Sequence, residues 1–272
     1  MSLTQPLHLR SNYDVVMKRF LIILLLALSA PWAQAQPKDC ALVVMHGKWG
    51  NPNYIAAFGR RMEPACDFES IEMPWSGRRN YDAPYPVALQ EIAAQVQKFR
   101  VQGYKKILLA GHSFGANAAL AYMTVYDDVD GILLLAPGHT PGMMVYQMNM
   151  NRGALLEAQE LMAQGRPDTL VNFDDLNQGK FRNSKIRADA LWTYFDPAGM
   201  GSMQLSAKRF KKPVPVFLAI GTRDPLFRTA KANIFEATPA HAASQYVELD
   251  ADHGSTPGAA GAAALAWIQQ LP

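Results

Sequence analysis

Short apolar runs alternate with amphipathic segments along most of the chain. Runs typical of strands occur at residues 40–45, 67–73, 106–110, 131–136, 214–220 and 245–249; those at 40–45 and 106–110 have the pattern of buried strands, and the one at 67–73 alternates. Apolar residues at helical spacing predict helices at 51–62, 86–100, 113–122, 153–164 and 259–270, and Asp224-Pro225 opens another. Such alternation favours an α/β fold with a mostly parallel, doubly wound sheet that is covered on both faces.

The alternation is interrupted between about residues 138 and 212. Beyond the helix at 153–164, this stretch is irregular and holds Asn, Gly, Met and aromatic residues. We interpret it as a small, partly helical lid insertion over one end of the sheet. Its methionines, in 141–150 and 199–203, either line an acyl pocket or pack the insertion onto the body. The same two alternatives hold for Trp192, Tyr194 and Phe195.

The N-terminus has the pattern of a targeting signal. Basic Lys18 and Arg19 precede an apolar run at 20–28, and Ala33 and Ala35 offer small residues before Gln36. We therefore predict a bacterial-type signal peptide at 17–35 after an upstream extension at 1–16. The mature protein is expected in the periplasm or secreted from the cell. The run is about half of the ~20 residues that span a bilayer, so no membrane span should remain after cleavage; an uncleaved anchor is the alternative.

The composition of the whole sequence narrows the class of protein, and the predicted mature domain comprises residues 36–272. An apolar fraction of 49% supports a sizeable core, and 18% charged residues exclude a disordered chain. Three positive residues and one negative residue lie before Gln36, so a formal net charge of +3 becomes +1. This balance provides no electrostatic footprint for nucleic acid. Cys40 and Cys66 form either one disulfide or two buried thiols, and no Cys/His spacing indicates a metal site.

A Gly-x-Ser-x-Gly sequence carries the main chemical signal. Gly111, Ser113 and Gly115 lie between a predicted strand and a helix of small residues. A nucleophilic serine needs a sharp turn that exposes its hydroxyl, and glycines there remove side chains that would clash. Ser113 is the predicted nucleophile.

A serine hydroxyl needs a base, and the base needs an orienting carboxylate. His253 follows the last predicted strand and is the predicted base; His139, after an earlier strand, is the weaker alternative. Asp224 follows the strand at 214–220 and is the predicted carboxylate, although Asp-Pro also commonly caps a helix. Asp250 and Asp252, close to His253, are the other candidates.

Two backbone N–H groups should hold the oxyanion of a tetrahedral intermediate. Phe114, directly after the nucleophile, is one predicted donor. The other is expected from the loop 46–50 after the first strand, where Lys48 is the first choice and Trp49 the next.

These motifs together resemble the α/β-hydrolase superfamily. The resemblance rests on His46-Gly47 after a strand, the turn around Ser113, Gly221-Thr-Arg-Asp224-Pro and Asp252-His253-Gly, and it covers about residue 40 to the C-terminus. Met73-Pro-Trp-Ser76 and Tyr194-Phe-Asp-Pro197 also resemble a group of exported bacterial α/β-hydrolases, which implies no particular substrate. Little chain precedes the first strand, so the first strands of the fullest fold are expected to be missing.

The resemblance and the residues imply a serine hydrolase. The expected reaction is cleavage of a small-molecule or lipid-like carboxylic ester through an acyl-serine intermediate, without a metal or an organic cofactor. The alternatives are thioesterase or peptidase chemistry with the same residues, or a non-catalytic binding module of hydrolase fold.

Overall fold

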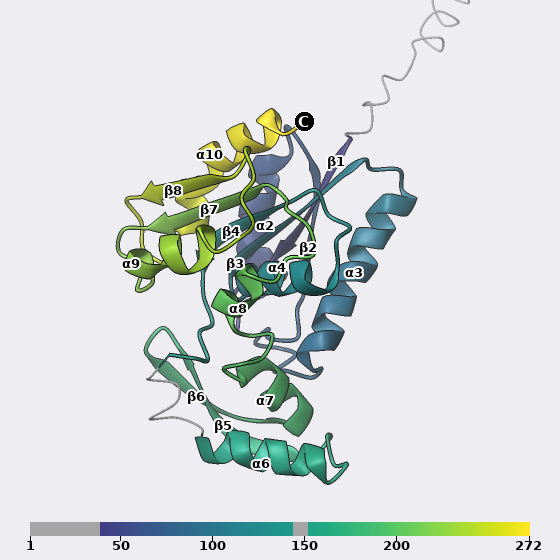
Figure 1. Cartoon of the computed structure of the whole chain (residues 1–272), viewed down its shortest axis with the longest axis vertical. Coiled ribbons are helices and arrows are strands. Elements are labelled where there is room, and N and C mark those ends of the chain that lie inside the picture. Colours follow the sequence, from purple (N-terminus) through teal and green to yellow (C-terminus); the bar gives the residue numbers. More distant parts are fainter. Residues whose placement is uncertain (1–38, 144–151) are drawn as a thin grey trace, which may run out of the picture. The chain divides into compact units, whose positions relative to one another are not determined.

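The computed structural model describes residues 39–143 and 152–272, so the predicted upstream extension and signal peptide lie outside the described residues. Its main feature is a six-stranded sheet with the order β2-β1-β3-β4-β7-β8, in which every pairing is parallel. The strands are β1 (Cys40–Met45), β2 (Asp67–Ile71), β3 (Lys106–Ser113), β4 (Gly131–Pro137), β7 (Val216–Gly221) and β8 (Gln245–Leu249) (Figure 1). The predicted parallel α/β fold is confirmed. Within the described residues, the sheet has no strand before β1.

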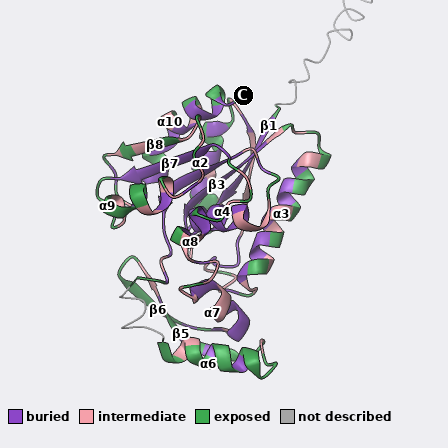
Figure 2. Cartoon of the chain, in the orientation of Figure 1, coloured by how far each residue is buried: buried purple, intermediate pink, exposed green. Residues whose placement is uncertain are grey.

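Both faces of the sheet are buried, because alternate residues of each strand enter two separate cores. From β1, Ala41, Val43 and Met45 pack with helices α3 (Tyr85–Val101) and α4 (Phe114–Val125). The residues between them pack with α2 (Pro52–Met62) and α10 (Thr256–Gln270). Figure 2 shows β1, β3 and β7 largely buried and the edge strand β8 partly exposed. The other edge strand, β2, is half-buried along its length.

A disulfide joins the first residue of β1, Cys40, to Cys66, which directly precedes β2. The bond therefore closes a loop that contains α2. It lies at the end of β1 opposite to the loop 46–50, where the candidate site is found.

The segment at 138–212 contains more regular structure than its sequence predicts. Its elements are α6 (Arg152–Ala163), β5 (Leu170–Asn177), β6 (Lys180–Arg187), α7 (Ala188–Phe195) and α8 (Met203–Ala207). The antiparallel hairpin β5–β6 is a correction to the irregular chain expected there. Gln178 and Gly179 form its two-residue turn with positive φ angles of 48° and 76°. Residues 144–151, which include several of the methionines, lie outside the described residues.

After β7 the chain forms α9 (Phe227–Ala230), which continues as a short π-helix, η1 (Lys231–Phe235). Throughout the described ranges, no helix combines the length and the apolar character needed to cross a membrane.

Candidate active site

Ser113 occupies a strained turn between β3 and α4. Its φ of 55° and ψ of −113° place a non-glycine residue in backbone space that L-residues rarely adopt. Strain of this kind costs about 1–3 kcal/mol and is concentrated at functional sites. A Cβ on Gly111 would lie 2.0 Å from the carbonyl carbon of Gly115, and one on Gly115 would lie 2.4 Å from Met45 O. Both glycines of the motif are therefore required by close backbone contacts.

The turn lies where the strand order of the sheet reverses. From β1 the chain moves outward to β2, and it then returns to place β3 on the other side of β1. Loops that leave such neighbouring strands diverge and open a crevice at their carboxyl ends, where ligands bind in doubly wound sheets. The loop 46–50 after β1 and Ser113 at the end of β3 face this crevice.

His253 and Asp224 are brought into direct contact from the loops after β8 and β7. His253 Nδ1 lies 2.6 Å from Asp224 Oδ2, and the Asp224 side chain is fully buried. Asp224 Oδ1 accepts the backbone N–H of Leu226 at 2.7 Å, so the carboxylate also holds the turn before α9. A neutral His253 that donates its Nδ1 proton to the carboxylate keeps Nε2 as an acceptor, which is the form of a general base.

Ser113, His253 and Asp224 all line one pocket of about 260 Å³. A Cβ on Gly138 would lie 2.5 Å from Ser113 Oγ and 3.3 Å from His253 Cε1, so both side chains lie against this glycine. No hydrogen bond joins Ser113 to His253 in the described structure, and such contacts commonly tighten only when substrate binds. The structure thus brings the three residues together, and their catalytic roles stay a prediction.

The other carboxylates near His253 have different partners. Asp252 is exposed and accepts the hydroxyl of Ser255 at 2.7 Å and the backbone N–H of Ser255 at 2.8 Å, and these two hydrogen bonds lower the pKa of this carboxyl. Asp250 forms a surface ion pair with Arg223. In the described residues, the hydrogen bond from a carboxylate to the His253 ring comes from Asp224 and not from Asp250 or Asp252.

The alternative base, His139, lies in the same pocket but its ring is held elsewhere. It stacks on Phe114 with a centroid distance of 3.8 Å, and its Nε2 lies 2.7 Å from Tyr194 O. Because a carbonyl only accepts, Nε2–H is the donor. Burial, and after it the charge of Lys48, holds the pKa of His139 well below its usual value. This arrangement favours a structural role for His139.

The loop 46–50 is fixed by hydrogen bonds along its length. Trp49 N–H donates to Trp75 O at 2.9 Å, and this bond disfavours Trp49 as an oxyanion donor relative to Lys48. Gly47 O accepts Gly50 N–H at 3.0 Å and lies 2.8 Å from His46 Nδ1. In a planar trans peptide the N–H points away from the C=O, so these two contacts orient the peptide that carries Lys48 N–H.

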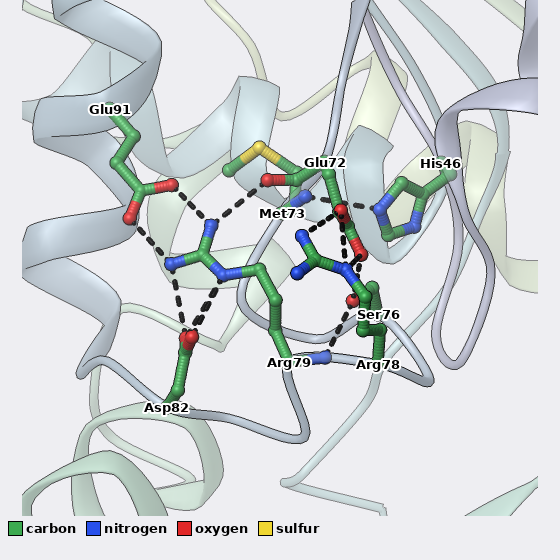
Figure 3. Close-up of polar contacts among 8 residues, drawn as sticks. All are labelled: His46, Glu72, Met73, Ser76, Arg78, Arg79, Asp82 and Glu91. Atoms are coloured by element: carbon green, nitrogen blue, oxygen red, sulfur yellow. Dashed lines mark hydrogen bonds and ion pairs between the residues drawn. The ribbon is translucent and has the colours of Figure 1, made fainter.

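The segment after β2 supports this loop from one side, as Figure 3 shows for His46 and the two arginines. Arg79 binds Glu91, Asp82 and the carbonyl of Glu72, while Arg78 pairs with Glu72. Met73 N–H donates to His46 Nε2 at 3.1 Å, and Trp75 Nε1 donates to His46 O at 2.9 Å. Arg78 and Arg79 therefore hold the loop's neighbours, and Trp75, fully buried, stacks on Phe114.

The insertion supports the loop from the other side through Asp175, a residue that is not among the sequence-predicted site residues. Its buried carboxylate accepts from Lys48, Trp49 and Tyr81. The alternation of Val171 and Phe173 along β5 places Asp175 on the same inward face, which is the one pattern that points to it.

Two further cavities adjoin the site. One of about 350 Å³ reaches Ser113 from the side of Trp49, Tyr54, His112 and Lys180. Another of about 520 Å³ shares Thr140, Met143 and Leu226 with the pocket of Ser113 and is also lined by Met203. Tyr194 and Phe195 are buried in the core and do not line these three cavities. Of the two alternatives for these residues, packing of the insertion onto the body is therefore the one observed.

No group of three or more potential metal ligands occurs in residues 39–143 and 152–272.

The chain belongs to the alpha/beta hydrolase family, whose model matches residues 42–264. No curated protein matches it.

Solved structures share the fold at low sequence identity. A monoacylglycerol lipase from Paleococcus ferrophilus has a TM-score of 0.62 at 16% identity, covering 87% of this chain and 96% of the other. An esterase domain from a Rhodothermus marinus protein has 0.55 at 16% identity, covering 88% and 89%. The thioesterase domain from the curacin biosynthetic pathway has 0.51 at 16% identity, covering 86% and 93%. These likenesses concern the fold.

Proposed function

We propose that the protein is a serine hydrolase that cleaves a carboxylic ester through an acyl-serine intermediate. The observation that carries the proposal is the convergence of Ser113, on its strained turn, with the hydrogen-bonded pair of His253 and Asp224 in one pocket. A pure binding module would not need a strained serine beside a histidine held by a buried carboxylate.

The proposed reaction has two halves. His253 Nε2 takes the Ser113 proton as Oγ attacks the ester carbonyl, and Asp224 stabilises the imidazolium. The N–H groups of Lys48 and Phe114 hold the oxyanion. His253 then gives the proton to the departing alcohol, and water repeats the sequence to release the acid.

The pocket supports an ester or lipid-like substrate. Its lining beyond the reacting residues includes Pro137, Leu176, Pro225 and Leu226, which offer apolar surface to an acyl group. The adjoining cavity with Met143 and Met203 extends that surface. Esterases and lipases are among the structural neighbours.

We also propose that the chain is exported after removal of residues 17–35 with whatever precedes them. The disulfide between Cys40 and Cys66 supports this proposal, because disulfides persist in oxidising compartments outside the cytoplasm. Esters met in the cell envelope or outside the cell would then be the substrates.

A fluorophosphonate probe tests the proposed nucleophile on the chain beginning at Gln36. We expect stoichiometric labelling of the wild type at Ser113 and none of Ser113→Ala. Turnover of p-nitrophenyl esters, matched thioesters and peptide amides then distinguishes the reaction classes. Labelling of Ser113→Ala at another residue, or an unreactive folded wild type, contradicts the proposal.

A further inference from the structure

The insertion reaches the loop 46–50 through one buried carboxylate. The Asp175 side chain on β5 is 0% exposed and accepts three hydrogen bonds. Lys48 Nζ donates to Oδ1 at 2.6 Å, while Trp49 Nε1 and Tyr81 OH donate to Oδ2 at 2.8 and 2.7 Å.

Two of these donors belong to residues with unusual backbones. Trp49 and Tyr81 both have a φ of 58°, which is rare for bulky residues and must be imposed by surrounding contacts. Both direct their polar atom to the same carboxylate oxygen. Asp175 therefore fixes the loop 46–50 and the segment after β2 relative to each other.

Lys48 is held by the hairpin β5–β6 at more than one atom. Besides the ion pair, Lys48 Nζ donates to Leu176 O at 3.1 Å, and Lys48 O accepts from Asn177 Nδ2 at 3.2 Å. Its ammonium lies 5.1 Å from the centroid of the Phe195 ring. The Lys48 side chain is only 3% exposed, and a buried ammonium of this kind is stabilised by a buried carboxylate such as Asp175.

We propose that Asp175 is a positioning residue of the catalytic site: by holding the side chains of Lys48 and Trp49, it sets the Lys48 N–H that binds the oxyanion. This inference rests on the proposed function. Asp175 does not touch the reacting atoms, and it acts through the loop 46–50. The hairpin is thus part of the catalytic apparatus and not a cover that opens independently of it.

Asp175→Asn is the principal test, because it keeps the shape of the side chain and removes its charge. The amide offers one acceptor where the carboxylate offers two, and it removes the negative charge that Lys48 Nζ contacts at 2.6 Å. We expect kcat for a p-nitrophenyl ester to fall about 100-fold, the order seen when a reacting group is displaced by about 1 Å, while KM changes little.

A reversible tetrahedral inhibitor separates positioning from general damage. Ser113 adds to an alkyl trifluoromethyl ketone, its proton passes to His253, and the adduct places an oxyanion at the Lys48 N–H. The inhibition constant should rise in Asp175→Asn by the factor by which kcat falls. The inhibition constant of the product acid, which forms no adduct, should stay near the wild-type value.

Asp174→Asn is the matched control, since it makes the same chemical change at the next, exposed position, where Asp174 accepts from Asn183. Its kinetics should equal those of the wild type. Equal losses in both variants, or a lower kcat without weaker ketone binding, would refute positioning through the oxyanion. So would wild-type kinetics in a folded Asp175→Asn.

A second variant keeps the proposal testable if Asp175→Asn does not fold. The double substitution Lys48→Met with Asp175→Leu removes both charges together, and such replacements of buried pairs are often tolerated. It still deprives Trp49 and Tyr81 of their acceptor, so the same kinetic pattern is expected, and wild-type kinetics would again refute the proposal. If the wild type reacts with the fluorophosphonate probe and Asp175→Asn has wild-type kinetics, only this inference is contradicted. If the folded wild type does not react with the probe, the proposed function is contradicted.

Discussion

Asp224 uses its two oxygens for two different tasks. One binds the imidazole of His253, and the other accepts the N–H of Leu226 in the turn before α9. The cap-like role of an Asp-Pro pair and the orienting role that we propose for this carboxylate thus occur in the same residue. The turn fixes the carboxylate, and the carboxylate in turn fixes the ring.

Asp224→Asn tests this role at the level of one residue. An amide that presents its NH₂ to Nδ1 stabilises the wrong tautomer of His253, so kcat should fall about 10⁴-fold with an intact fold. Ester turnover measures the loss, and circular dichroism checks the fold. Asp252→Asn should retain wild-type turnover, because its partner is Ser255. The reverse pattern would transfer the role to Asp252.

The sequence predicted Ser113, His253 and Asp224 of the candidate site but not Asp175. Ser113 has a local motif, and His253 and Asp224 follow strands, so each can be placed at the carboxyl edge of a parallel sheet. Asp175 has no such marker: it is one of two adjacent aspartates in a polar stretch. Its importance comes from burial among Lys48, Trp49 and Tyr81, which are remote in sequence.

At the scale of elements, the strands of the main sheet were predicted well and the hairpin β5–β6 was not. The central strands β1, β4 and β7 are continuous apolar runs because both of their faces are buried. On β5 the inward residues are Val171, Phe173 and Asp175, so a buried charge interrupts the alternation that would reveal a strand. The predicted fold class did not depend on this hairpin and is confirmed.

The disulfide leads to a prediction about β1 and β2. Reduction should lower the free energy of unfolding by about 3 kcal/mol, the typical stabilisation from closing a loop of this size. Urea unfolding of the chain beginning at Gln36, with and without a reductant, measures the difference. Cys40→Ala with Cys66→Ala should unfold at about the same urea concentration as the reduced protein.

The position of the disulfide also leads to a prediction about ester turnover. The disulfide lies at the amino end of β1, and the candidate site lies at the carboxyl ends of β1 and β3. Ester turnover in dilute buffer should therefore be the same in the reduced and oxidised proteins. Inactivation by a reductant without unfolding would show that the two ends of the sheet are coupled.

At the scale of the whole molecule, buried histidines connect folding to pH. Burial lowers the pKa of His46 and of His139, and burial together with the nearby His253 lowers the pKa of His112 to about 4. These rings must remain neutral in the folded chain, whereas in the unfolded chain each takes up a proton below about pH 6.5. The contribution of these neutral histidines to the free energy of unfolding is therefore fully present above that pH, and it is lost as the pH falls toward 4.

For His112 the shift corresponds to about 3 kcal/mol by pH 4. Urea unfolding at a series of pH values between 7.5 and 4 measures the loss. His112→Gln keeps a donor for the carbonyl of His253 and does not titrate, so its stability should fall less steeply over this range. An equal slope in the wild type and the variant would contradict the assignment.

The attachment of the hairpin β5–β6 to the loop 46–50 affects how this scaffold can diversify. In a modular architecture, the insertion (residues 138–212, the cap) is exchanged to alter specificity, while the main sheet and its helices (the body) are inherited unchanged. Here the boundary between the two parts runs through a buried ion pair, with Lys48 on the body and Asp175 on the cap. A recombinant that receives a foreign cap inherits half of the pair, so cap and loop are expected to be exchanged as a unit or not at all.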